Sequence, residues 1–311
     1  MKSAAALLKQ KFAPLPSCDL KGRPFVNKPS LGKKLAEYKR HPFSLVMMVL
    51  VILSALATAA VVLWIVIHVI MQGAPNLKAS LFELEYDSEN LSLMPAFFNT
   101  LIIAGMSLLI AVPVGVAAAI FLTEYTSSAN KFVAVVRMAA ETLAGIPSIV
   151  YGIFGMILFV EMLFKGFSLI AGILTMAIMI LPLVMRTTEE ALRAVPDSFR
   201  EGSFALGAGK LRTIFRVVLP SAMPGIIAGV ILALGRVVGE TAALIYTSGT
   251  VKAVPDSLFG SGETLAIHMY TLSSEGLHVN EAWATAIVLI LLVLVINGAA
   301  EFISNKFRKR Y

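Results

Sequence analysis

The chain has 311 residues, of which 58% are apolar and 14% are charged, and it carries a formal net charge of +7. Soluble domains usually contain about 45–50% apolar residues. The apolar surface is therefore more than a water-soluble fold of this length buries, and lipid must solvate part of it. This composition argues against a soluble enzyme. The single cysteine, Cys18, cannot form an internal disulfide, so cysteine usage says nothing about the redox compartment.

Six apolar segments are each close to the length of about 20 residues that crosses a hydrocarbon core as a helix. They predict an all-α integral membrane protein with one transmembrane domain over residues 43–311. The first segment has 29 residues, too long for the apolar part of a cleavable signal peptide, and we interpret it as a signal anchor. Little more than Gly166 separates the third segment from the fourth, which predicts a tight hairpin. The predicted spans are 43–71, 96–122, 143–164, 167–185, 222–246 and 283–303.

The distribution of lysine and arginine predicts the orientation of these spans. Of 26 such residues, 22 lie on the side that holds both termini, three lie in the opposite loops, and Arg236 lies within a span. By the positive-inside rule both termini are cytoplasmic, and the acidic stretch 82–90 faces outward. The positive charge is thus a topology signal, and it does not indicate nucleic-acid binding. The cytoplasmic side comprises residues 1–42, 123–142, 186–221 and 304–311.

Residues 1–42 form a basic cytoplasmic arm in this prediction. Ten Lys and Arg residues fall within residues 1–40, together with four prolines. A basic segment next to a span is attracted to anionic lipid headgroups. We therefore interpret the arm as a segment that rests on the lipid bilayer, and binding to a protein partner stays open as an alternative.

The longest cytoplasmic loop, at about residues 186–220, contains the signals of a short helix. Pro196 suits the start of a helix, and Gly207 or Gly209 can end it. Residues 211–219 alternate basic and apolar side chains, which favours a separate helix at the membrane surface. An ordinary amphipathic connector would carry similar signals.

The stretch GSFALGAGK, residues 202–210, superficially resembles a phosphate-binding P-loop. In a P-loop the lysine follows the second glycine, and a Ser or Thr follows the lysine. Here Ala208 follows Gly207, and Leu211 follows Lys210. We therefore expect this chain to bind no ATP by that route and to hold no cofactor, so that any ATP hydrolysis would come from a partner.

The fifth predicted span contains two charged residues, Arg236 and Glu240, within the sequence ALGRVVGETAAL. Each charge costs about 2.5–3.5 kcal/mol at the centre of a membrane helix. Four residues apart on a helix, they would share one face. One interpretation is a salt bridge that locks helix packing, although desolvation offsets its attraction. The other is an anion path, in which the Arg236 guanidinium binds oxyanions and Glu240 neutralises it at rest. Small residues that would let another helix approach this face are Gly225, Gly229, Gly235 and Gly239.

The long cytoplasmic loop resembles the EAA loop of type I ABC importer permeases. Glu201-Gly202-Ser203, then Gly207, then Leu219-Pro220 match the spacing of that motif, although Gly202 and Ser203 replace its usual two alanines. The resemblance implies a short coupling helix that docks in an ATPase subunit. The residues that would serve this coupling are Glu201, Ser203, Ala205 and Gly207.

Two further stretches resemble the membrane subunits of the bacterial phosphate-specific transport system. They are GRVVGETAAL at residues 235–244 and AGIPSIVYGIFG at residues 144–155, and FNTL at residues 98–101 is a weaker match. The resemblance covers about residues 43–311. It implies a multi-pass subunit of the cytoplasmic (inner) membrane that translocates inorganic phosphate by alternating access. Its substrate pathway would include Arg236, Glu240, Pro147 and Ser148.

The same resemblance implies the partners of the chain. These are a homologous second permease, PstC, as the other half of a heterodimer, two copies of the ATPase subunit PstB, and the extracytoplasmic phosphate-binding protein PstS. ATP hydrolysis would take place in PstB, and this chain would catalyse no covalent reaction.

Other functions stay open from the sequence alone. They are a permease for another oxyanion such as sulfate or molybdate, an ion-coupled secondary transporter, and a membrane sensor or scaffold. A secondary transporter has no need of an ATPase-docking loop, and a sensor has no need of charges within a span.

The remaining polar residues yield weaker predictions. Arg137 and Glu141, four residues apart, are predicted to pair with each other. In the outer loop, at about residues 247–282, His268 and His278 are ten residues apart. That spacing fits no metal-binding pattern, so we expect no metal site there. We place both histidines on a surface helix.

The first prediction concerns the orientation. Reporter fusions at residues 30, 205 and the C-terminus are expected to report a cytoplasmic location, and fusions at residues 85 and 265 an external one, because Lys and Arg are so unequally distributed. An external location for residue 205 would contradict both the orientation and the coupling loop.

Overall fold

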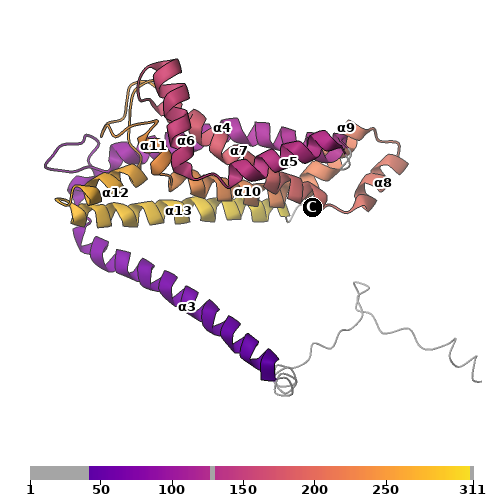
Figure 1. Cartoon of the computed structure of the whole chain (residues 1–311), viewed down its shortest axis with the longest axis horizontal. Coiled ribbons are helices and arrows are strands. Elements are labelled where there is room, and N and C mark those ends of the chain that lie inside the picture. The colour runs from indigo at the N-terminus through magenta and orange to yellow at the C-terminus, as the bar shows by residue number, and fades with distance from the viewer. Residues whose placement is uncertain (1–41, 127–129, 309–311) are drawn as a thin grey trace, which may run out of the picture. The chain divides into compact units, whose positions relative to one another are not determined.

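The computed structural model describes residues 42–126 and 130–308, and every regular element in these two ranges is a helix. This confirms the all-α prediction. The predicted arm at residues 1–42 lies almost wholly outside the described residues. The helices, labelled in Figure 1, are α3 (Pro42–Gly73), α4 (Met94–Ile120), α5 (Lys131–Ala144), α6 (Ser148–Gly155), α7 (Leu169–Arg193), α8 (Asp197–Ala205), α9 (Lys210–Thr213), α10 (Leu219–Val238), α11 (Ala242–Ile245), α12 (Leu265–Ser274) and α13 (Val279–Arg308).

Three π-helical segments extend these helices. Phe121–Tyr125 continues α4, Met156–Phe164 continues α6, and Ile214–Val218 joins α9 to α10. Two short 3₁₀ turns, Ala74–Asn76 and Ala79–Phe82, follow α3.

The chain divides into two units, residues 1–65 and residues 66–311. Most of α3 belongs to the first. This helix runs without an internal proline from Pro42, which suits a helix start, to Gly73. None of the 18 residues in its most apolar window is buried. Such a helix requires lipid or another subunit around it.

Five helical stretches are long and apolar enough to cross a membrane, and a sixth is possible if α5 and α6 form one bent span. The expected number of spans is thus met only with this bent pair. The chain turns by 99° between α5 and α6, so the main helical part of the span predicted at residues 143–164 begins at Ser148, after the bend. Pro147 explains the turn, since it has no amide proton to donate and disfavours helical geometry in the residue before it.

The hairpin between the third and fourth predicted spans is confirmed. Lys165 adopts a left-handed conformation with φ of +53°, and Gly166 N donates a hydrogen bond to Val160 O at 2.9 Å. Ser168 then begins α7, because its hydroxyl accepts a hydrogen bond from Ala171 N at 3.3 Å. The chain therefore reverses direction within a few residues.

The fifth predicted span differs from the structure at both ends. The stretch Lys210–Val238 is one helical rod, so the separate surface helix predicted at residues 211–219 was wrong. The rod ends at Val238 rather than at residue 246. Because α7 also continues to Arg193, the segment between the two rods is shorter than the predicted loop at residues 186–220.

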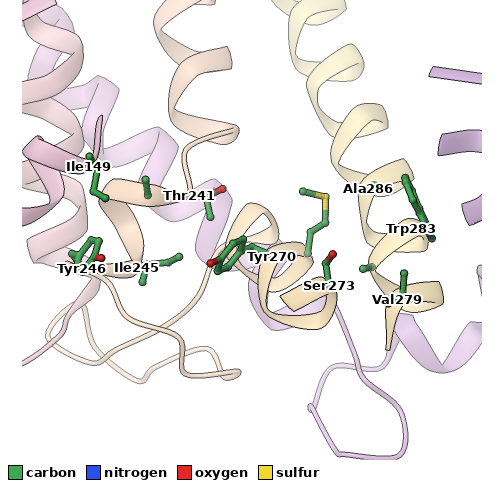
Figure 2. Close-up of a pocket in the computed structure, with 12 residues that line it drawn as sticks. Ile149, Thr241, Ile245, Tyr246, Tyr270, Ser273, Val279, Trp283 and Ala286 are labelled. Atoms are coloured by element: carbon green, nitrogen blue, oxygen red, sulfur yellow. The ribbon is translucent and has the colours of Figure 1, made fainter. Parts of the chain in front are cut away.

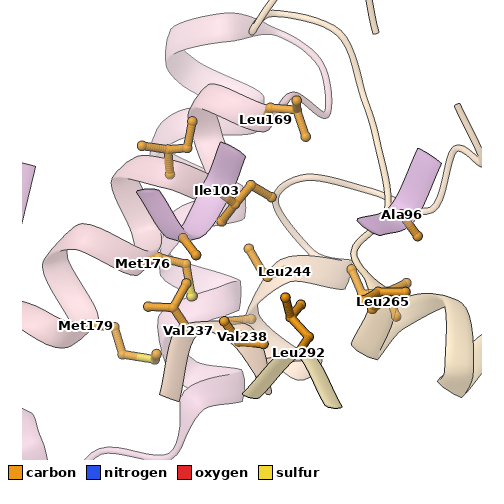
Figure 3. Close-up of a cluster of buried hydrophobic side chains, with 14 of the residues drawn as sticks. Ala96, Ile103, Leu169, Met176, Met179, Val237, Val238, Leu244, Leu265 and Leu292 are labelled. Carbon is orange, nitrogen blue, oxygen red and sulfur yellow. The ribbon is translucent and has the colours of Figure 1, made fainter. Parts of the chain in front are cut away.

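The core of the second unit lies where α4, α7, α10, α11 and α12 meet. Ile103, Met176, Val237, Leu244 and Leu265, one from each helix, are almost fully buried in one cluster (Figure 3). Lipid is as apolar as these side chains, so close packing rather than water exclusion must hold the helices together inside the bilayer.

Glycines allow α10 to lie directly on α7. A Cβ atom added at Gly225 would lie 2.7 Å from the Cβ of Ala191, and one added at Gly229 would overlap Thr187. The close approach predicted for these two glycines is confirmed. At Gly235 the same added atom meets nothing within 4 Å, so the helix face beside Arg236 is open.

The two ends of the helix bundle carry different structures. Helices α8 and α9 lie at one end, where α13 also finishes, and α11 and α12 lie at the other (Figure 1). The outer loop predicted at about residues 247–282 contains α12 and the first residues of α13.

Helix α12 is tied to α4 by buried polar contacts. His268 Nδ1 lies 2.6 Å from Glu263 Oε1, and the two residues are 0% and 1% exposed. The prediction that both histidines lie on a surface helix was therefore wrong, because His268 is buried and His278 lies between the end of α12 and the start of α13. Asn99 Nδ2 donates to Glu263 O at 3.1 Å, and Thr100 Oγ1 accepts from Leu265 N at 2.9 Å. The FNTL stretch thus anchors the outer loop.

Lys252 adds a further polar contact to this end of the bundle. Its Nζ donates to the Tyr86 hydroxyl at 3.1 Å. Burial lowers the pKa of Lys252, but the hydrogen bond to Tyr86 and the charges of Glu263 and Glu275 outweigh it, so the pKa is raised above its usual value. Lys252 therefore keeps its charge at neutral pH.

We expect His268→Leu to destabilise the protein by about 1–3 kcal/mol, because it leaves the Glu263 carboxyl buried without its partner. The measurement is the thermal unfolding midpoint in detergent. Tyr270→Leu, at an exposed position on the same helix, is the control. The double variant His268→Leu/Glu263→Leu should recover much of the loss, and an unchanged midpoint for the single variant would contradict the role of the pair.

Candidate functional site

Helix α8 ends in a motif that requires glycine. Gly207 has φ of +82°, a conformation that side-chain-bearing residues disfavour. Gly207 N donates to Phe204 O at 2.9 Å, and Ala208 N donates to Ser203 O at 3.1 Å. This is the Schellman pattern, which satisfies the last carbonyls of a helix. The prediction that Gly207 ends the helix is confirmed.

The face of α8 is largely exposed. Glu201 and Ala205 are exposed, and Ser203 is partly covered, with its hydroxyl 2.8 Å from Thr213 Oγ1. Phe199, Phe204 and Leu206 also present large apolar surface to solvent. A groove of about 510 Å³ adjoins them, lined by residues of α8 and of the following segment, including Ser198, Gly202, Arg212 and Val217. Clustered exposed apolar side chains of this kind mark a surface for another protein.

Arg200 connects α8 to the ends of two long helices. Its Nη2 donates to Glu124 Oε1 at 2.7 Å and to Leu192 O at 3.0 Å. Sequence reasoning missed this residue. Its pairing with Asp197, three residues earlier, is visible as a helix pattern, but Glu124 is 76 residues away and only the fold brings it close.

A second ionic cluster lies at the ends of α5 and α7. Glu189 Oε1 is 2.7 Å from Arg137 Nε and 2.7 Å from Arg193 Nη2. The prediction that Arg137 pairs with Glu141 was wrong, because α5 packs on α7 and the carboxylate of Glu189 lies closer. Glu189 therefore joins α5 to the last turn of α7.

The helix that carries Arg236 stops before Glu240. Helix α10 ends at Val238, and Glu240 lies in the break before α11. The expectation that Arg236 and Glu240 share one helical face was therefore wrong. Glu240 is 8% exposed, and its Oε1 accepts a hydrogen bond from Ala243 N at 3.2 Å. Its carboxylate thus caps the short helix α11.

Arg236 pairs with no carboxylate of the described residues. It is partly exposed. The intrahelical salt bridge considered from the sequence is thus not formed. Arg236 is a cation in a membrane-spanning rod with a free face next to it.

Pro147 and Ser148 lie at the turn from α5 into α6. Pro147 precedes the first residue of α6 and is exposed, and Ser148 is partly exposed. Five residues after Pro147 the chain is in contact with α11, since a Cβ atom added at Gly152 would lie 2.8 Å from Ala243 Cα. The two helix breaks, before α6 and before α11, are thereby brought to the same region.

A cavity of about 590 Å³ opens beside these breaks (Figure 2). Ile149, Thr241 and Tyr246 line one side of it, and Tyr270 and Ser273 of α12 face them. Arg236, Glu240, Pro147 and Ser148 are not among its lining residues, so the structure does not bring the four predicted pathway residues into one cavity. Among the described residues no group of three or more His, Cys, Asp or Glu side chains is placed to hold a metal ion.

These features define a multi-pass membrane protein with a region of broken helices in its bundle and, at one end, a helix with exposed apolar side chains. Residues 111–309 match the binding-protein-dependent transport system inner membrane components. The chain belongs to this family, and it is a multi-pass protein of the bacterial inner membrane.

Curated relatives agree with this assignment. The probable ABC transporter permease protein YqgI of Bacillus subtilis is 37% identical over 230 residues, which cover 68% of this chain and 78% of the relative. The phosphate transport system permease protein PstA 1 of Mycobacterium tuberculosis is 38% identical over 211 residues, covering 67% and 69%. PstA of Mycobacterium leprae is 40% identical over 210 residues, covering 66% and 68%.

Solved structures share the fold at low sequence identity. A chain of the inward-facing MetNI methionine ABC transporter matches with a TM-score of 0.57 and 21% identity, over 72% of this chain and 99% of that one. A chain of a bacterial alginate ABC transporter matches with a TM-score of 0.58 and 17% identity, over 82% and 94%. The fold is that of a type I ABC importer permease.

The end of α8 generates the next prediction. Gly207→Val is expected to fray this end, because a β-branched residue in the left-handed region costs about 1–2 kcal/mol. Limited proteolysis of the detergent-solubilised protein should then cut residues 203–210 faster. Gly202→Ala, where the added Cβ meets nothing, is the matched control and should slow cleavage, since alanine favours a helix. Equal cleavage of both variants would contradict the motif.

Proposed function

We propose that this chain is the membrane-spanning translocation subunit of an ATP-driven importer of inorganic phosphate. The observation that carries the proposal is Arg236, a guanidinium in a membrane-spanning rod without a carboxylate partner among the described residues. Such a charge is costly next to lipid. The Arg236 side chain is therefore expected to contact an anion or another subunit.

Several features support an oxyanion as the ligand that Arg236 binds. A guanidinium offers a planar fork of donors that matches phosphate oxygens. The open face at Gly235 leaves room beside it. Two relatives with 38% and 40% identity are named as phosphate transport permeases. We therefore assign Arg236 to the substrate pathway, with Glu240 as the cap that keeps the neighbouring break in shape.

Pro147 and Ser148 belong to the pathway in this proposal because their break adjoins α11. The turn at Pro147 leaves backbone amides at the start of α6 without helical partners. Such broken helices are tolerated in a membrane where they line a wet cavity. A conformational change at this point would alter access to Arg236.

The proposed complex has four kinds of subunit. A homologous permease, PstC, forms the other half of the pathway, two PstB subunits bind ATP and magnesium, and PstS delivers phosphate from outside. Helix α8, with Glu201, Ser203, Ala205 and Gly207, docks in PstB. In this proposal the chain itself hydrolyses no ATP, and α8 lies on the cytoplasmic side.

Alternating access supplies the mechanism. ATP binding closes the PstB pair and displaces α8, and the region around Arg236 changes the side to which it opens. The exposed apolar side chains of α8 and the Schellman motif that ends it at Gly207 support its role as the docking element.

We expect Arg236→Leu to reduce phosphate uptake by about 10-fold to 100-fold, which corresponds to the loss of a charge-assisted contact of about 1.5–3 kcal/mol. Arg236→Lys should also be impaired, because an ammonium cannot reproduce the guanidinium fork. Uptake is measured in cells or vesicles and normalised to the amount of assembled complex. Sulfate and molybdate serve as competitors, and inhibition by either equal to that by phosphate would favour a different oxyanion.

Glu240→Gln is the matched control for this experiment. The amide oxygen can still accept from Ala243 N, so α11 is kept while the charge is removed. We expect near-normal uptake if Glu240 acts as a cap. Wild-type uptake by an assembled Arg236→Leu variant would contradict the anion path.

A further inference from the structure

Helix α8 has no buried side chain, and Phe199 and Phe204 are about half exposed, so apolar packing against the described residues holds it only weakly. It is joined to α7 by residues 194–196 and to α9 by residues 206–209. A helix of nine residues held only by two short connections would tilt easily. Its polar contacts with the rest of the chain therefore decide how it moves, and two of its side chains, Arg200 and Ser203, make such contacts.

Arg200 uses all five of its N–H donors. Nε donates to Glu124 Oε1 at 3.2 Å, while Nη2 donates to Glu124 Oε1 at 2.7 Å and to Leu192 O at 3.0 Å. Nη1 donates to Val195 O at 2.9 Å and to Asp197 Oδ1 at 3.0 Å. A guanidinium has five donors in a rigid plane. One side chain therefore connects the end of α4, the end of α7, the linker and the start of α8.

The contacts of Arg200 differ in how far they are shielded from water. The side chains of Arg200 and Glu124 are 16% and 9% exposed, whereas that of Asp197 is 85% exposed. An exposed ion pair contributes little because water and salt screen it. A shielded, two-point contact between guanidinium and carboxylate is stronger and fixes direction as well as distance. The Glu124 contact is thus the one that can transmit force.

The Leu192 contact leads further into the bundle. Leu192 lies in the last turn of α7, and Glu189, one turn earlier, holds Arg137 of α5 at 2.7 Å. Helix α5 is joined to α6 by the break that ends at Pro147. A displacement of α8 that moves the end of α7 would therefore also move α5 against the broken region beside Arg236.

We propose that Arg200 is a positioning residue that makes the ends of α4 and α7 follow α8. Without it, α8 would still bind its partner but would tilt about its two connections instead of moving the spans. This inference rests on the proposed function for the partner and the substrate. It assigns to Arg200 and Glu124 a role that docking alone does not require.

The test uses the complete transporter in proteoliposomes, with Arg200→Lys and Glu124→Gln in this chain. We expect the ATPase subunits to stay bound and ATP hydrolysis to stay within about twofold of the wild type. Phosphate uptake per ATP hydrolysed should fall by about tenfold or more, since lysine has three donors and no planar fork and glutamine lacks the charge. Asp197→Asn, which removes the exposed carboxylate from the same guanidinium, should leave this ratio unchanged.

A second readout is independent of phosphate. In a Cys18→Ser background, Ser273→Cys places a single thiol in the cavity lined by Tyr270 and Thr241. Its labelling rate by a maleimide should change with ATP in the otherwise wild-type complex and not in the Glu124→Gln complex. If labelling of the wild type changes with ATP but no phosphate is taken up, the proposed function is overturned. The labelling comparison would still test the role of Arg200.

Three results would overturn the inference. The first is a normal ratio of uptake to hydrolysis, with ATP-dependent labelling, in both Arg200→Lys and Glu124→Gln. The second is an equal loss of that ratio in Asp197→Asn. The third is release of the ATPase subunits by Glu124→Gln, because Arg200 would then shape the docking surface rather than transmit its movement.

Discussion

Backbone polar groups inside a bilayer must find partners within the protein, and this constraint governs the region around Arg236. The chain breaks a span before α6 and another before α11, and each break is repaired locally. Ile146 N donates to Leu143 O at 3.1 Å, Glu240 N donates to Val237 O at 3.2 Å, and the Glu240 carboxylate caps Ala243 N. The close packing of Gly152 on Ala243 then holds the two repaired segments against each other. Irregular backbone is costly where it faces lipid, so its presence at two places marks this part of the bundle as the candidate functional region.

The protein is held together differently along its length. In the middle, Ile103, Met176 and Val237 pack in one apolar cluster, and the hydrogen bond from Ser107 Oγ to Ile173 O at 3.2 Å is a polar contact between α4 and α7. At one end the Glu263–His268 pair and the amide of Asn99 join α12 to α4. At the other end Glu189 and Glu124 hold arginines of α5, α7 and α8. Apolar packing tolerates small sliding movements, whereas hydrogen bonds and ion pairs fix direction. The helices can therefore shift slightly in the centre of the bundle, whereas polar contacts fix their directions at its two ends.

Much of this architecture could be predicted from the sequence, because length, hydropathy and helix-ending signals are local properties. The apolar runs predicted the spans, and Gly207 predicted the end of α8. The short connection between the third and fourth spans predicted the hairpin at Lys165 and Gly166.

Contacts between residues far apart in the sequence could not be predicted. Arg137 was assigned to Glu141 because the two share a helix, and the competing Glu189 is 52 residues away. The break at Gly239 was missed because one glycine in an apolar run is compatible with a continuous helix. His268 was placed on the surface because no sequence pattern reveals that Glu263 is folded against it.

The unpaired charge of Arg236 has an electrical consequence for the membrane in which the protein resides. A fixed positive charge in a medium of low dielectric constant raises the energy of any other cation that approaches it far more than it would in water. Sodium ions and protons therefore meet a barrier at Arg236, the residue that would bind an anion in the proposed pathway. The bacterial inner membrane stores energy as a proton gradient, and a pore that opened without such a barrier would discharge it. In the proposed pathway, the residue that attracts the anion thus also acts as an electrostatic barrier to cations.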